Sequence, residues 1–229
     1  MPTLWEMLRK KVEDANKPVA KPLEFQFYNP LGIRINHTMK IDMVEQGEDL
    51  APLNFTLRQI RVVDRQVGQQ NFQFVDYDVM ARSLVGKPNL NMRVRLIPME
   101  DPDANATHNV ILFKKLTEFG YHQEFHEGLA FEKNNGEIQE HEAFEATYWR
   151  PDGITEPWEC STTLLRDEDN SGKVDENEAR HGKLTYWDFH RQTTDDTGDF
   201  IEWYMVEMDD KGYFEIWVGK EISAVRISV

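Results

Sequence analysis

The chain has 229 residues, of which 40% are hydrophobic, 11% aromatic and 29% charged. This composition excludes an intrinsically disordered chain, and the length fits one large or two small globular domains. The net charge of −15, from 41 acidic and 26 basic side chains, disfavours nucleic acid and anionic lipid headgroups as partners.

Residues 1–17 are expected to form an amphipathic helix. Apolar side chains recur there at helical spacing, beginning with Leu4, and charged side chains lie opposite them. Thr3 and Glu6 have the spacing of a capping box, and Pro18 prevents continuation. The helix either packs on its own domain or docks on a protein partner.

The next segments alternate between apolar and polar residues, which predicts strands with one face in solvent. The alternating runs are residues 23–27, 32–36, 71–75 and 92–96. Residues 98–107 lose hydrophobicity and gather turn residues, which indicates a domain boundary or a long surface loop. We therefore predict a first β-rich lobe over 23–98 and a second over 107–229, with one continuous domain as the alternative.

In the carboxy-terminal half, turn signals recur between apolar runs and predict an antiparallel meander. These turns fall at 134–136, 151–153, 195–198 and 209–212. The last runs carry aromatic residues on both alternating faces, so we expect the second face to be covered by another sheet, by sheet curvature or by the helix. The predicted fold class is α+β and mostly antiparallel β, as a meander, sandwich or partial barrel with an amino-terminal helix.

The segment from Asp167 to Glu178 has the pattern of a calcium-binding loop. Calcium prefers six to eight oxygen ligands, and alternate positions of a tightly coiled loop supply them. Gly172 provides the sharp bend, and Val174 anchors the loop on the protein. The expected ligands, with Lys173 contributing its backbone carbonyl, are Asp167, Asp169, Ser171, Lys173, Asp175 and Glu178.

This loop resembles that of the EF-hand family, which implies one Ca²⁺ site. The resemblance covers residues 167–178 alone, because the flanks look like strands and no second loop follows. A structural clip between strands is therefore a better interpretation than a sensor that opens a groove. The layout of the whole chain also resembles bacterial proteins grouped as domains of unknown function, which implies no mechanism.

Residues His122, Glu124 and His126 form a weaker candidate metal site. They share one face if the segment is extended, with a spacing that zinc ligands use. Solvent-exposed histidines in an acidic segment are the simpler interpretation, and the order of residues is not that of the metalloprotease motif.

Cys160 is the one cysteine, so an intramolecular disulfide is excluded, and we interpret it as a buried small residue rather than a nucleophile. Residues 1–17 have no signal-peptide core, and no window of the chain is apolar enough to span a membrane. We expect a cytoplasmic protein, unless a signal peptide has been removed.

No motif for nucleophilic catalysis or nucleotide binding is present in the sequence. We therefore expect a calcium-stabilised binding or structural module rather than an enzyme. The alternative is an enzyme or small-ligand carrier with a pocket in the aromatic-rich carboxy-terminal sheet. Such a pocket would be lined by Trp187, Trp203 and Trp217 together with a convergent charged residue.

Overall fold

The computed structural model describes ten segments of the chain, in which all regular structure is β. The segments are residues 28–41, 53–67, 70–81, 89–99, 108–116, 140–150, 155–167, 179–195, 198–222 and 227–228. Their strands are β1 (Thr38–Ile41), β2 (Leu53–Val67), β3 (Gln70–Ala81), β4 (Leu90–Pro98), β5 (His108–Lys115), β6 (Glu140–Ala143), β7 (Ala146–Trp149), β8 (Trp158–Arg166), β9 (Arg180–Asp195), β10 (Gly198–Asp209), β11 (Phe214–Ile222) and β12 (Ile227–Ser228). The predicted helix over 1–17 and the predicted strand over 23–27 lie outside the described residues.

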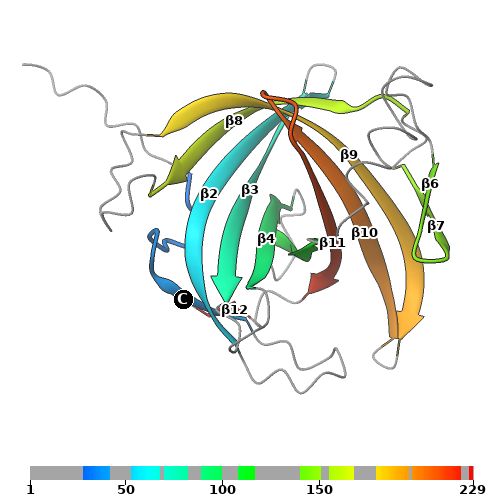
Figure 1. The fold of residues 1–229 in the computed structure, drawn as a ribbon, viewed down its shortest axis with the longest axis horizontal. Coiled ribbons are helices and arrows are strands. Elements are labelled where there is room, and N and C mark those ends of the chain that lie inside the picture. The colour runs from blue at the N-terminus through cyan, green and yellow to red at the C-terminus, as the bar shows by residue number, and fades with distance from the viewer. Residues whose placement is uncertain are drawn as a thin grey trace, which may run out of the picture.

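Eight of the strands close into an antiparallel barrel (Figure 1). Seven neighbours follow the order β2, β3, β4, β5, β11, β10, β9, and β8 pairs with both β9 and β2 to complete the ring. Closure removes the unpaired edges that an open sheet would expose. The prediction of antiparallel β structure is confirmed. Because β4 and β5 are direct neighbours, strands on both sides of residues 98–107 belong to one sheet.

Alternate side chains of a strand point to opposite faces of the barrel wall, and parts of both faces are buried. The inner face carries a cluster that includes Phe74, Phe113, Tyr186, Met205 and Trp217. Outside, two accessory segments cover the wall: residues 28–41 pack on β2 to β5, and the β6–β7 hairpin packs on β9 and β10. This double burial explains the aromatic residues on both faces of the last strands.

Two expectations about these strands are wrong. The run 32–36 is irregular and ends in a turn rather than forming a strand, because Gly32 and Asn36 have φ angles of 63° and 66°, which interrupt an extended backbone. The run 92–96 does lie in β4, but its polar face is not in solvent, since Arg93 and Arg95 are 0% and 4% exposed. In a closed barrel the polar face of a strand can be the inner one.

Candidate functional site

The barrel interior holds a buried network of arginines and carboxylates. Asp76 and Asp78 of β3 lie directly opposite Arg95 and Arg93 of β4. Arg95 donates to the two oxygens of Asp76 at 2.7 and 3.0 Å. Arg93 donates to the two oxygens of Asp78 at 2.5 and 3.1 Å. The alternation of side chains in adjacent strands therefore places two bidentate ion pairs on the same face.

Glu207 of β10 connects these pairs across the barrel. Its Oε1 lies 2.7 Å from Nη1 of Arg93 and 2.7 Å from Nη2 of Arg61. Arg61 also donates to Asp76 at 3.0 Å. Since β10 pairs with β9 and β11, whereas Arg61 belongs to β2 and Arg93 to β4, these contacts span the interior. The network therefore ties opposite walls of the barrel together.

The arginines keep two of the network carboxylates ionised. Burial alone would raise the pKa of Asp76, but Arg95, Arg93 and Arg61 outweigh burial and hold that pKa well below its usual value. Burial opposes ionisation of Glu207 in the same way, yet Arg61 and Arg93 lower its pKa to about 2. Both carboxylates are consequently charged at neutral pH.

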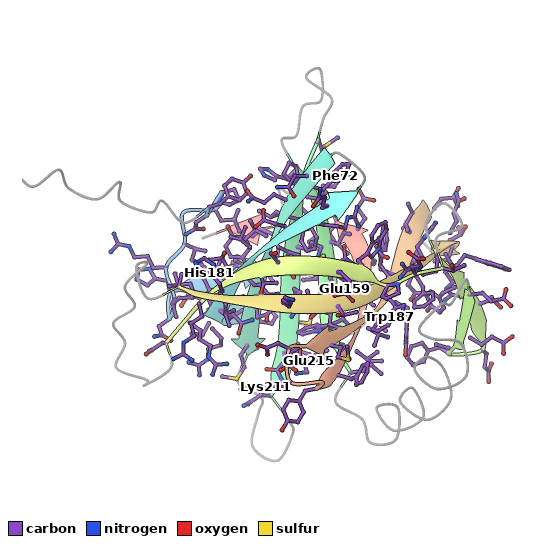
Figure 2. All side chains as sticks on the ribbon, turned by 90° about the horizontal axis from the view of Figure 1, so that it is seen from above. Phe72, Glu159, His181, Trp187, Lys211 and Glu215 are labelled. Carbon is purple, nitrogen blue, oxygen red and sulfur yellow. The ribbon has the colours of Figure 1, made fainter. Side chains whose placement is uncertain are left out.

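A cavity of about 480 Å³ opens at the end of the barrel where β8 ends and β9 begins. Its lining includes the buried Arg93 and Glu207, so the cavity reaches the ion network. His181 at the start of β9 and Lys211 and Glu215 of the β10–β11 hairpin also line it, and Figure 2 labels all three. The volume lies in the range of small-molecule sites.

Trp217 lines this cavity and is 2% exposed. The guanidinium of Arg93 stacks over its ring at 3.8 Å from the centroid. In the described part of the chain, neither Nε1 of Trp217 nor Nε of Arg61 has a hydrogen-bond partner. Buried donors are normally satisfied by a partner, and these two belong to residues that line the cavity, where a ligand or a water molecule could accept their hydrogen bonds.

The opposite end of the barrel is filled by side chains. The guanidinium of Arg65 lies over the rings of Phe72 and Trp158, at 5.6 and 4.2 Å from their centroids. Trp158 donates its indole N–H to Asp188 at 2.7 Å, and Arg65 donates to the hydroxyl of Tyr186 at 2.9 Å. Nε of Arg65 has no hydrogen-bond partner among the described residues, so buried unsatisfied donors occur at this end as well as at the cavity.

The three tryptophans named from the sequence have different positions. Trp217 lines the cavity, Trp187 lies in the cluster under the β6–β7 hairpin, and Trp203 packs against the inner cluster without lining the cavity. Cys160 is buried in the inner cluster, and burial raises its pKa to about 12, which confirms its interpretation as a buried small residue.

Of the six expected calcium ligands, Asp167 alone lies within the described residues. Nδ2 of Asn36 donates to its Oδ2 at 2.7 Å. The positions Asp169, Ser171, Lys173, Asp175 and Glu178 lie outside the described segments, as do His122, Glu124 and His126. The flanks of the loop are strands β8 and β9, which confirms the strand-like flanks expected from the sequence. The described residues contain no group of three or more His, Cys, Asp or Glu side chains that could hold a metal.

The ion network escaped sequence reasoning, although a signal for it exists. Acidic residues at 76 and 78 and basic residues at 93 and 95 alternate in two consecutive strands, which is the pattern of facing ion pairs. Their pairing depends on the strand register, which the sequence pattern does not give directly.

The fold and the cavity together define an eight-stranded antiparallel barrel with a polar interior that is accessible from one end. No protein-family model, curated protein or solved structure matches this chain. In the described segments, no helix is long and apolar enough to cross a lipid bilayer. The function must therefore be argued from the site itself.

Proposed function

We propose that this protein is a small-molecule-binding barrel whose ligand occupies the cavity between the ion network and the β8–β9 end. The observation that carries this proposal is the pair of unsatisfied buried donors, Nε1 of Trp217 and Nε of Arg61, on residues that line the cavity. A ligand with acceptor atoms would satisfy both donors.

The ion network supports binding because stability does not account for it. Replacing buried ion pairs with apolar side chains of similar volume is often neutral or stabilising. Arginines fixed by carboxylates, such as Arg93 between Asp78 and Glu207, instead provide a rigid polar surface at the inner end of the cavity. Preorganised polar groups of this kind reduce the free energy that a ligand must spend on ordering its site.

Binding is a better proposal than catalysis for the same residues. Asp76 and Glu207 have depressed pKa values because arginines neutralise them, and such carboxylates are weak bases at neutral pH. Burial raises the pKa of Asp78, but both of its oxygens already accept hydrogen bonds from Arg93. Burial keeps the thiol of Cys160 protonated, so it is a poor nucleophile.

A fragment screen with a blocking variant tests the proposal. Leu164 lines the cavity, so Leu164→Trp should fill its entrance. Ser161→Trp is the matched control, because Ser161 is an exposed residue outside the cavity lining and its side chain points to the other face of β8. Fluorine NMR of neutral, anionic and cationic fragments should show competition for one site in the wild-type protein and in the control. Binding should be lost in Leu164→Trp, and the absence of any such site would rule the proposal out.

We also propose that the loop from Asp167 to Glu178 binds one calcium ion and clips β8 to β9. Two observations favour this. The side chain of Asn36 holds Asp167, the first ligand position, at 2.7 Å, and the loop joins strands that are paired up to Leu164 and Arg180. A calcium ion would fasten the ends of this pair, which closes the barrel.

Titration calorimetry and thermal unfolding test the calcium site. The wild-type protein should bind one calcium ion and melt at a higher temperature with calcium present. Glu178→Gln removes the expected bidentate ligand and should weaken binding by about tenfold or more, whereas Glu176→Gln changes an equal charge at a non-ligand position. Equal calcium binding by the two variants would contradict the assignment of ligands.

A further inference from the structure

The charge of the cavity lining differs in sign from that of the whole chain. The described residues that line the cavity include eight lysines or arginines and five aspartates or glutamates. The chain as a whole has 26 basic and 41 acidic residues. Among the described residues, the cavity lining is therefore net basic, which favours an anionic over a cationic ligand within the cavity itself.

Most of the acidic groups in the lining have positively charged or backbone partners. Glu207 contacts Arg61 and Arg93, and Asp78 accepts two hydrogen bonds from Arg93. Glu215 lies 2.5 Å from Nζ of Lys115. These carboxylates are thus poorly placed to recruit a cationic ligand.

The first carboxylate of the β10–β11 turn, that of Asp209, is also engaged by hydrogen bonds. Asp209 accepts hydrogen bonds from the backbone amides of Lys211 and Tyr213, both at 2.9 Å. Lys211 makes no ion pair with any residue in the described segments, and it lines the cavity. The turn therefore presents an ammonium group to the mouth of the cavity while Asp209 is engaged. Asp210, the second acid of the turn, lines the cavity beside Lys211.

The unsatisfied atoms at the inner end have one chemical character. Nε1 of Trp217 and Nε of Arg61 can donate hydrogen bonds and cannot accept them. A ligand that brought donors or hydrocarbon to this position would leave both groups unpaired, at a free-energy cost that binding would have to overcome.

We propose that the ligand is a small organic carboxylate. Its carboxylate oxygens accept hydrogen bonds from Nε1 of Trp217 and Nε of Arg61, and its negative charge is stabilised by the basic lining of the cavity. This inference rests on the proposed ligand-binding function and specifies the chemical class of the ligand.

The test compares matched probes that differ in charge. Benzoate, 2-naphthoate and hexanoate are titrated into the full-length protein by calorimetry, next to their neutral amides and the corresponding amines. Inorganic phosphate serves as the non-organic anion. The carboxylates should bind with one site per chain and at least about tenfold more tightly than the amides, and their affinity should fall as sodium chloride is added.

Two variants locate the site, each with a matched control. Trp217→Phe keeps an aromatic ring under Arg93 but removes the N–H donor, and it should weaken carboxylate binding by about tenfold. Trp187→Phe makes the same change outside the cavity and should leave affinity unchanged.

Lys211→Glu should weaken carboxylate binding, whereas Lys114→Glu, at an exposed position outside the lining, should not. The Lys211 pair tests the proposal even if Trp217→Phe fails to fold.

The outcomes separate this inference from the proposed function. If amides or amines bind as tightly as carboxylates at a site that Leu164→Trp blocks, the barrel binds ligands but the carboxylate assignment is wrong. If phosphate alone binds, the site takes inorganic anions and the assignment is likewise wrong. If no probe of any charge binds, both proposals are overturned.

Discussion

Gly219 of β11 leaves no room for a side chain beside β5. A Cβ atom there would lie 2.5 Å from Cδ1 of Phe113 and 2.7 Å from the carbonyl oxygen of Leu112. Since a backbone atom cannot move as a flexible side chain does, Gly219→Ala should destabilise the protein by about 1–3 kcal/mol in urea unfolding. Gly182→Ala is the control with a milder contact, 3.3 Å to Oγ1 of Thr162. If Gly219→Ala lowered the free energy of unfolding no more than Gly182→Ala does, the close contact of Gly219 with β5 would not limit the packing there.

Glu207 carries the charge that balances the arginines from opposite walls. Glu207→Gln keeps the shape but leaves Arg61 and Arg93 short of a counter-charge, so it should cost about 3–5 kcal/mol of stability at pH 7. The folded-state pKa of Glu207 is lowered from 4.5 to about 2. A depressed pKa stabilises the folded state above pH 4.5, and this stabilisation is lost as the pH falls towards 2.

The difference in stability between wild type and Glu207→Gln should therefore shrink over that pH range. Urea unfolding of both proteins at pH 7, 4.5 and 3 measures it. A difference that stayed constant would show that the ionised form of Glu207 does not stabilise the network.

The β6–β7 hairpin has a strained turn. Phe144 and Glu145 have φ angles of 52° and 60°, in the left-handed region that favours glycine or asparagine. Phe144 packs against Tyr204, so Glu145 is the better position to change. Glu145→Gly should remove the free-energy cost of a positive φ angle, and we expect this gain to exceed the loss from the greater conformational entropy of the unfolded chain. The free energy of unfolding should therefore rise by about 0.5–1 kcal/mol. Glu142→Gly, in the extended part of β6, should instead lower it.

Alternating sequence patterns predicted the positions of individual strands but not the contacts that those segments make in the fold. Residues 71–75 and 92–96 lie in β3 and β4 as predicted, because apolar side chains at every second position favour a pleated backbone. The same pattern at 32–36 failed, since the conformations of Gly32 and Asn36 depend on contacts made by the fold. One such contact is the hydrogen bond from the side chain of Asn36 to Asp167.

At the scale of the whole molecule, barrel closure depends on pairings between distant segments. β8 joins β2, about a hundred residues earlier, to β9, and no local pattern specifies that partner. The ion network depends on the same closure, because Glu207 meets Arg61 and Arg93 across the interior. Trp217 could be named from the sequence as an aromatic lining residue, but its unsatisfied donor is visible only in the folded barrel.

The closing strands are also where calcium should act. If the loop from Asp167 to Glu178 clips β8 to β9, calcium should slow hydrogen exchange in those strands, near Leu164 and Leu184. Exchange in β3 and β4 should change little, because the network holds these strands without the loop. Mass spectrometry of exchange with and without calcium measures this, with Glu178→Gln as the variant that should not respond.

A structural calcium site and a calcium-driven conformational switch predict changes in hydrogen exchange in different parts of the chain. The described flanks of the loop are the strands β8 and β9, which pair with each other, and β8 also pairs with β2. No pair of helices therefore flanks the loop in the described residues to open as in a calcium sensor. Calcium should therefore tighten β8 and β9 without increasing the binding of an apolar dye. Strong calcium-dependent dye binding, or faster exchange in residues 4–15, would mean that calcium drives a conformational change instead of fastening the barrel.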